Sequence, residues 1–251
     1  MKPKSPTNSW TSQTQGRRSF LGKAFATCAI TPIAPLTALQ FGTSGGGSLT
    51  KEERDRMTPA QVIDELKKGN ERFRTRKMVS HDYIAQKKSS AAGQYPAAVI
   101  LGCIDSRAPA EIIFDTGIGD AFIARIAGNV PNDDLLGSLE FACAVAGAKL
   151  ILVLGHTACG AVKGAIDDVV LGNLTGLLAR IKPAIPATKF DGEKTSKNGA
   201  YVDAVAKTNV ELALDNIRRR SAILADLEKK GSIQIIGAMY NVANGMVDFL
   251  A

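Results

Sequence analysis

The chain has 251 residues, 45% of them hydrophobic, which is enough to bury the core of one domain with short additions. Its formal net charge is +7, but the first 42 residues hold five basic side chains and no acid, which leaves only +2 for the rest. The rest also lacks a basic stripe with interleaved aromatic residues, so its composition argues against a nucleic-acid-binding protein.

The first residues have the pattern of an export leader. Arg17 and Arg18 are followed by Phe-Leu and then by a moderately apolar stretch, residues 24–39. This order resembles a twin-arginine signal, which carries folded proteins to the periplasm or, in a photosynthetic organism, to the thylakoid lumen. The stretch contains two prolines and is too short for a good membrane span, so we expect membrane contact only through an uncleaved leader. A disordered tail that happens to contain two arginines is the alternative.

A Gly- and Ser-rich segment, residues 42–48, is typical of a flexible linker. We therefore expect residues 1–48 to be leader and linker and residues 49–251 to form the folded domain. Near its start, Thr58-Pro59-Ala60-Gln61 predicts a helix that extends to about residue 76. Threonine is the N-cap, proline occupies the first turn, and Gln61 closes a capping box.

Short apolar runs then alternate with helical patterns. The alternation predicts an α/β fold in which a parallel-rich sheet is flanked by helices on both faces. Asn132 is positioned to cap the first of these helices. In such sheets ligands bind at the carboxyl ends of the strands. The predicted strands are residues 97–102, 121–127, 149–154 and 232–239, and the predicted helices are residues 132–147, 159–170 and 202–229.

Candidate metal ligands follow two of the predicted strands. Cys103 ends the first strand, and His156 ends the third with Cys159 three residues later. Adjacent parallel strands would bring these side chains to one rim of the sheet, where two thiols, an imidazole and the carboxylate of Asp105 make a ligand set for tetrahedral zinc. A disulfide between Cys103 and Cys159 is the competing interpretation for an exported protein. Cys143 falls on the apolar side of a helical pattern and is predicted to be an inert core thiol.

The role of Asp105 stays open between two interpretations. It accepts a hydrogen bond from zinc-bound hydroxide while Arg107 keeps it ionised, or it ligates zinc itself and closes the site. A purely structural zinc is a further alternative. Glycines at 102, 155 and 160 flank the donors, either to let the backbone approach closely or to form turns.

At these residues the chain resembles a β-carbonic anhydrase. The motifs are Cys-x-Asp-Ser-Arg at 103–107, Ala-Gly-Asn at 127–129 and His-x-x-Cys-Gly at 156–160, and the similarity covers roughly residues 55–251. The resemblance implies reversible hydration of carbon dioxide to bicarbonate and a proton by attack of zinc-bound hydroxide. It also implies a homodimer or higher homo-oligomer, zinc on Cys103, His156 and Cys159, and a catalytic pair of Asp105 and Arg107.

Three further positions carry over from the family. Gln94 matches a glutamine that binds substrate across the dimer interface, Phe122 matches an aromatic residue of the substrate pocket, and Phe141 replaces a nearby tyrosine. Two other functions use the same framework. One is hydrolysis of carbonyl sulfide or carbon disulfide, and the other is a catalytically idle zinc-binding assembly protein, for which the Asp105–Arg107 pair would have no use.

Overall fold

The computed structural model of the protein describes residues 46–250, so the predicted leader lies outside the described residues. Within them, one sheet has the strand order β2-β1-β3-β4-β5. The first four strands are parallel, and β5 runs antiparallel to β4. The predicted parallel-rich α/β sheet is therefore confirmed. The strands are β1 (Ala98–Gly102), β2 (Ala121–Arg125), β3 (Leu150–His156), β4 (Gln234–Tyr240) and β5 (Val247–Phe249).

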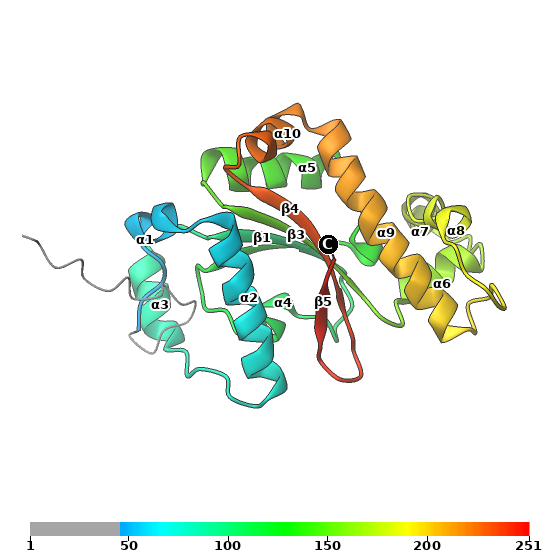
Figure 1. Ribbon diagram of the computed structural model, residues 1–251, viewed down its shortest axis with the longest axis horizontal. Coiled ribbons are helices and arrows are strands. Elements are labelled where there is room, and N and C mark those ends of the chain that lie inside the picture. Colours follow the sequence, from blue (N-terminus) through cyan, green and yellow to red (C-terminus); the bar gives the residue numbers. More distant parts are fainter. Residues whose placement is uncertain (1–45, 251) are drawn as a thin grey trace, which may run out of the picture. The chain divides into compact units, whose positions relative to one another are not determined.

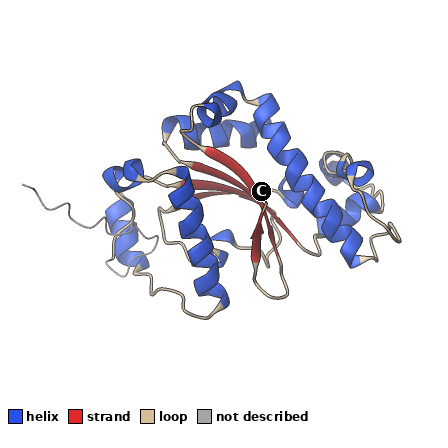
Figure 2. Ribbon diagram, in the orientation of Figure 1, coloured by secondary structure: helices blue, strands red, loops and turns tan. Residues whose placement is uncertain are grey.

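Helices cover both faces of this sheet (Figure 2). The segment before β1 forms α1 (Lys51–Arg56), α2 (Pro59–Arg74) and α3 (Tyr83–Ser90), and α4 (Ala110–Ile113) follows β1 (Figure 1). The remaining helical elements are η1 (Ala127–Asn129), α5 (Asp133–Glu140), η2 (Phe141–Val145, a π-helix), α6 (Gly160–Ile166), α7 (Gly172–Leu178), α8 (Ala184–Ala187), α9 (Gly199–Arg220) and α10 (Ala222–Lys229).

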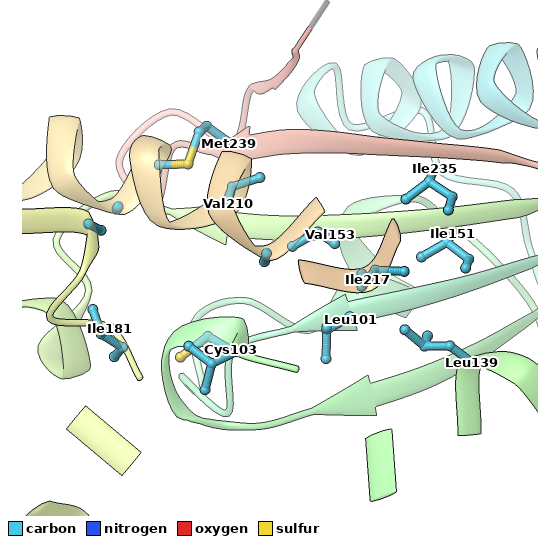
Figure 3. Close-up of a cluster of buried hydrophobic side chains, with 14 of the residues drawn as sticks. Leu101, Cys103, Leu139, Ile151, Val153, Ile181, Val210, Ile217, Ile235 and Met239 are labelled. Atoms are coloured by element: carbon cyan, nitrogen blue, oxygen red, sulfur yellow. The ribbon is translucent and has the colours of Figure 1, made fainter. Parts of the chain in front are cut away.

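Alternate residues of the central strands face two separate apolar clusters. On β3, Leu150, Leu152 and Leu154 pack in one cluster with residues of α2 and α4. Ile151 and Val153 pack in the other, which contains the buried side of α9 (Figure 3). A strand that is buried on both faces needs apolar residues at every position, which explains the unbroken apolar run in the sequence.

Local capping signals set the helix starts that the sequence predicts. The side chain of Thr58 accepts a hydrogen bond from Gln61 N in a complete capping box, and the helix begins at Pro59. Asn132 accepts a hydrogen bond from the backbone of Leu135 and caps α5. The predicted single helix at 202–229 is instead two helices, because Ser221 has an extended backbone and caps α10.

Contacts of the described chain begin at the end of the predicted linker, just before the predicted domain boundary. Ser48, the last residue of the predicted linker, donates from its backbone to Ser89 Oγ at 2.9 Å and from its hydroxyl to the Ile118 carbonyl at 2.6 Å. The end of the linker is thus docked on α3 and on the turn before β2. Among residues 46–250, every helix is too short or too polar to cross a bilayer.

Strand pairing fixes where the predicted ligands emerge. Gly102 of β1 lies opposite Leu154 of β3, so both strands reach the same edge of the sheet at the same level. Cys103 follows directly after β1, as Figure 3 shows, and His156 is the last residue of β3. The fold therefore brings two segments that are far apart in the sequence to one rim.

Candidate metal centre

Three donor groups gather at this rim. The side chains of Cys103, His156 and Cys159 are buried, and one donor atom from each lies within 4.8 Å of the others. Ligands of a tetrahedral zinc, at about 2.0–2.3 Å from the metal, lie roughly 3.3–3.8 Å apart. Movements of about an ångström therefore close the three donors onto one ion. Both cysteines are free thiols, which rules out the disulfide interpretation for this structure.

The histidine presents the correct nitrogen to such an ion. Nδ1 of His156 lies 2.9 Å from the backbone carbonyl oxygen of Thr157. Because a carbonyl only accepts hydrogen bonds, Nδ1 carries a hydrogen, and in the neutral ring Nε2 then has the lone pair. Nε2 is buried and has no hydrogen-bond partner among the described residues. A buried nitrogen lone pair beside two thiols fits zinc, and its fixed tautomer is the usual arrangement for a metal-binding histidine.

Backbone groups support the first cysteine. Gly128 N donates a hydrogen bond to Cys103 Sγ at 3.3 Å, and Asn209 of α9 holds the Gly128 carbonyl through Nδ2 at 2.8 Å. The neighbouring Cys159 thiol, together with the Gly128 amide, lowers the pKa of Cys103. The pKa of Cys159 is raised, because the first thiolate and burial both disfavour a second negative charge. A divalent cation would relieve this repulsion between the thiolates.

The carboxylate of Asp105 is engaged by Arg107. Oδ1 accepts from the Arg107 backbone N at 2.9 Å and from Nε at 3.0 Å, while Oδ2 accepts from Nη2 at 2.8 Å. These bonds lower the pKa of Asp105 to about 2, so it is ionised at neutral pH. Oδ2 also lies 3.9 Å from Nε2 of His156. The carboxylate thus faces the donors while both of its oxygens are held by the arginine.

A second arginine at this rim was not predicted from the sequence. Arg125, the last residue of β2, donates from Nε to the Cys103 carbonyl at 2.8 Å and from Nη2 to the Asp105 carbonyl at 2.5 Å. It therefore ties the backbone of the Cys103–Asp105 segment to the neighbouring strand. A charged residue near the end of an otherwise apolar run was the signal that could have identified it.

An apolar cavity of about 280 Å³ adjoins the donors. Cys103 and Asp105 form its polar end. Much of its wall comes from α6 and α7, and α7 has no counterpart among the predicted helices. The other lining residues are Ile104, Ala127, Gly160, Ala161, Gly164, Leu174 and Leu178.

The three predicted pocket residues do not line this cavity. Phe122 pairs with Val99, four residues or about 13 Å along the strand from Cys103. Its ring packs edge-to-face on Phe141, with the ring centroids 6.2 Å apart. Gln94 is exposed and precedes β1, at the opposite end of the strand from the donors. One subunit alone therefore does not bring these side chains to its own metal centre.

The second histidine of the chain also lies outside the metal centre. The side chain of His81 is buried, with Nε2 3.1 Å from Asp115 Oδ1, and its ring stacks on Tyr83. The carboxylate of Asp115 also accepts from Nε of Arg72. The imidazole is thus part of a buried structural network rather than a free base at the rim.

The chain is similar to carbonic anhydrases in sequence. Residues 98–247 match the carbonic anhydrase family. Carbonic anhydrase 2 of Mycobacterium tuberculosis is 37% identical over 193 residues, which cover 74% of this chain and 90% of that protein. The carbonic anhydrase of Mycolicibacterium smegmatis is 35% identical over 196 residues, which cover 76% and 92% of the two chains.

Solved structures of β-carbonic anhydrases have the same fold. CafA of Aspergillus fumigatus superposes with a TM-score of 0.57 at 28% identity, covering 65% of this chain and 79% of that one. A tetrameric β-carbonic anhydrase of Sordaria macrospora gives 0.56 at 26% identity, covering 64% and 83%. With the fold, the donor set and the sequence in agreement, this chain belongs to the carbonic anhydrase family, whose reaction is the zinc-dependent, reversible hydration of carbon dioxide.

Proposed function

We propose that Cys103, His156 and Cys159 hold the zinc with which this carbonic anhydrase hydrates carbon dioxide. The observation that carries the assignment is the buried, unpartnered Nε2 of His156 beside two free thiols. Zinc held by these two thiolates and one imidazole would supply a bound water whose pKa is lowered toward about 7. The apolar cavity beside this position suits carbon dioxide, a small molecule without a charge or a hydrogen-bond donor.

In this proposal Asp105 orients the attacking water. Its Oδ2 would accept a hydrogen bond from the water and so direct a lone pair of the water oxygen toward the carbon of carbon dioxide. Arg107 has two tasks. Its guanidinium keeps Asp105 ionised, and by donating to both carboxylate oxygens it holds the carboxylate in its present orientation and competes with the metal for it. We therefore infer an open site rather than a resting state in which Asp105 is the fourth ligand.

We further propose that the enzyme is a homodimer or a higher homo-oligomer with a shared site. β2 is an edge strand of the sheet, and exposed apolar side chains flank it on both faces: Phe141, which packs on Phe122, on one, and Ile112 and Ile118 on the other. Such an edge is a typical subunit interface. The tetrameric relative supports an oligomer. Gln94, Phe122 and Phe141 would then complete the partner's site, which explains why they lie away from the donors of their own subunit.

Mixing two inactive variants tests the shared site. In a mixed dimer of Cys103→Ser and Gln94→Ala subunits, one site combines the intact ligands of the second subunit with the intact Gln94 of the first. We expect the two variants to be weakly active alone and to recover activity after subunit exchange. Mixed dimers that form but remain as inactive as their parents would refute a site built from two subunits.

The catalytic assignment is tested by stopped-flow hydration of carbon dioxide with zinc quantified in the same sample. Asp105→Ala should retain about one zinc per chain and lose most of its activity, on the order of 10²-fold or more. Full activity of this variant would refute the orienting role. If the enzyme preferred carbonyl sulfide or carbon disulfide to carbon dioxide, the substrate assignment would have to be changed. Stoichiometric zinc without turnover of any of these three would indicate an idle assembly protein.

For the leader, we propose that residues 1–48 direct export of the catalytic domain through a twin-arginine-type route to the periplasm or the thylakoid lumen. The support is the sequence pattern around Arg17 and Arg18. A zinc site of buried ligands agrees with a route that carries folded, metal-loaded proteins. Replacing both arginines by lysine should retain the full-length chain in the cytoplasm of a host with that route, as cell fractionation would show. Unchanged export of this variant would contradict the proposal.

A further inference from the structure

The turn that joins two of the proposed zinc ligands contains a residue in an unusual conformation. Ala158, between His156 and Cys159, has a φ of 54°. The left-handed region is disfavoured for residues with a Cβ atom, and glycine is the usual choice there. The surroundings of Ala158 must therefore hold it in place.

Hydrogen bonds from two directions fix this turn. From the side of β4, Thr157 N donates to the Tyr240 carbonyl at 2.9 Å, and Val242 N donates to Thr157 Oγ1 at 3.1 Å. From the side of α9, Oδ1 of Asp203 accepts from Ala158 N at 2.7 Å. Among the described contacts, the bond to Asp203 is the one that holds the amide of the left-handed residue.

The same residue connects to the Asp105–Arg107 pair. The Ala158 carbonyl accepts a hydrogen bond from Nη2 of Arg107 at 3.3 Å, and this nitrogen also donates to Asp105 Oδ2. Ala158 is thus hydrogen-bonded through its amide to Asp203 and through its carbonyl to Arg107. A change in its conformation would disturb both the turn that carries His156 and Cys159 and the arginine that orients Asp105.

We propose that Asp203 is a positioning residue of the metal centre. Its carboxylate holds Ala158 in the left-handed conformation, so that His156 and Cys159 face Cys103 and the Ala158 carbonyl faces Arg107. This inference rests on the zinc site proposed above.

A purely structural role for Asp203, fastening α9 to the sheet, makes a different prediction. α9 is already anchored by its buried side chains, among them Val202 and Val205. Figure 3 shows two more, Val210 and Ile217. Removing a half-buried carboxylate should therefore leave the helix in place. A positioning residue acts on metal affinity and coordination geometry, whereas a structural residue acts on the stability of the metal-free protein.

The experiment measures zinc affinity by competition with a chelator, using the full-length protein. Asp203→Ala should bind zinc about 10–100-fold more weakly, as expected when the support of a metal ligand is lost. Its cobalt-substituted form should have an altered visible absorption spectrum. Thr208→Ala is the matched control, because the Thr208 hydroxyl bonds to the Ala204 carbonyl of its own helix. Equal zinc affinities and equal cobalt spectra for Asp203→Ala and native protein would overturn the inference.

Two further variants distinguish positioning from general damage to the fold. Asp203→Asn keeps an oxygen that accepts the same hydrogen bond and should retain zinc affinity near the native value. Ala158→Gly removes the steric need for support, so adding it to Asp203→Ala should recover much of the lost affinity. Loss of zinc from Asp203→Asn as severe as from Asp203→Ala would overturn the inference, and so would a double variant without recovery.

Failure of the zinc assignment would be visible separately. If Cys103→Ser bound zinc as tightly as native protein, the proposed ligands would be wrong, and the positioning role of Asp203 would be refuted as well. If Cys103→Ser lost zinc while Asp203→Ala did not, only the role of Asp203 would be refuted.

Discussion

Replacement of Gly155 by alanine tests how closely the ligand-bearing strand approaches its covering helix. Gly155 immediately precedes His156 in β3. A Cβ atom at this position would lie 2.5 Å from Val210 Cγ2 and 2.7 Å from Met239 Sδ, two side chains of the buried cluster in Figure 3. Favourable contacts between such atoms are at about 3.5–4.0 Å. α9 or its side chains would therefore have to retreat by about 1 Å.

The neighbouring strand provides a matched control. Gly102 immediately precedes Cys103, but a Cβ atom there would meet no atom within 4 Å. Overpacking a core costs about 1–3 kcal/mol, and replacing glycine by alanine within a strand returns about 0.5–1 kcal/mol. We therefore expect Gly155→Ala to lower the free energy of unfolding by about 1–2 kcal/mol. Gly102→Ala should leave it unchanged or raise it by up to about 1 kcal/mol.

Denaturant-induced unfolding of the metal-free proteins measures this difference, and chelator competition measures zinc affinity in parallel. Because the retreat of α9 also displaces Asp203, Gly155→Ala should bind zinc more weakly than Gly102→Ala. Equal free energies of unfolding for the two variants would show that the core around Gly155 can accept a methyl group. This would refute the inference that β3 lies too close to α9 for a side chain at this position.

Three other predictions concern single side chains. Since the pKa of Asp105 is about 2 in the folded protein against an ordinary value of 3.8, its pair with Arg107 stabilises the fold above about pH 4, and this stability is lost as the pH falls toward 2. Arg107→Ala should return this pKa toward 3.8, as NMR titration of the carboxylate would show; a value still near 2 would contradict the assignment. Burial raises the pKa of Cys143 to about 12, so Cys143→Ala should retain stoichiometric zinc and hydration activity, and loss of zinc would contradict its core role. Asn209→Ala should lower the free energy of unfolding by about 1–3 kcal/mol, because it leaves a buried carbonyl without its donor; denaturant unfolding tests this, and an unchanged midpoint would argue that water replaces the amide.

The parts of the fold that the sequence predicts are those specified by local chemistry. The capping box at Thr58 and the cap at Asn132 are confirmed because each depends on residues three positions apart. α7 was not predicted: Leu171 at its start makes no side-chain cap, and Gly172 has a φ of 43°. β5 was missed because three residues are too few to show alternation.

The same distinction applies to the metal centre. Cys103 and His156 were predicted to meet because each ends an apolar run, and strands of a parallel sheet share an edge. The contacts of Asp203 with Ala158 and of Asn209 with Gly128 span 45 and 81 residues. No local pattern in the sequence reports such contacts, since they depend on where α9 lies across the sheet.

The pairing of β1 with β3 has a consequence for how the protein folds without its metal. The loop between Cys103 and His156 is closed by ladder hydrogen bonds between core strands rather than by the metal. Few residues would therefore have to become ordered when the metal binds. Small zinc domains differ, because they fold only when zinc is bound. The two ligands keep their relative positions through the pairing of the strands that carry them, and the many residues between them in the sequence do not have to be held in place by the metal.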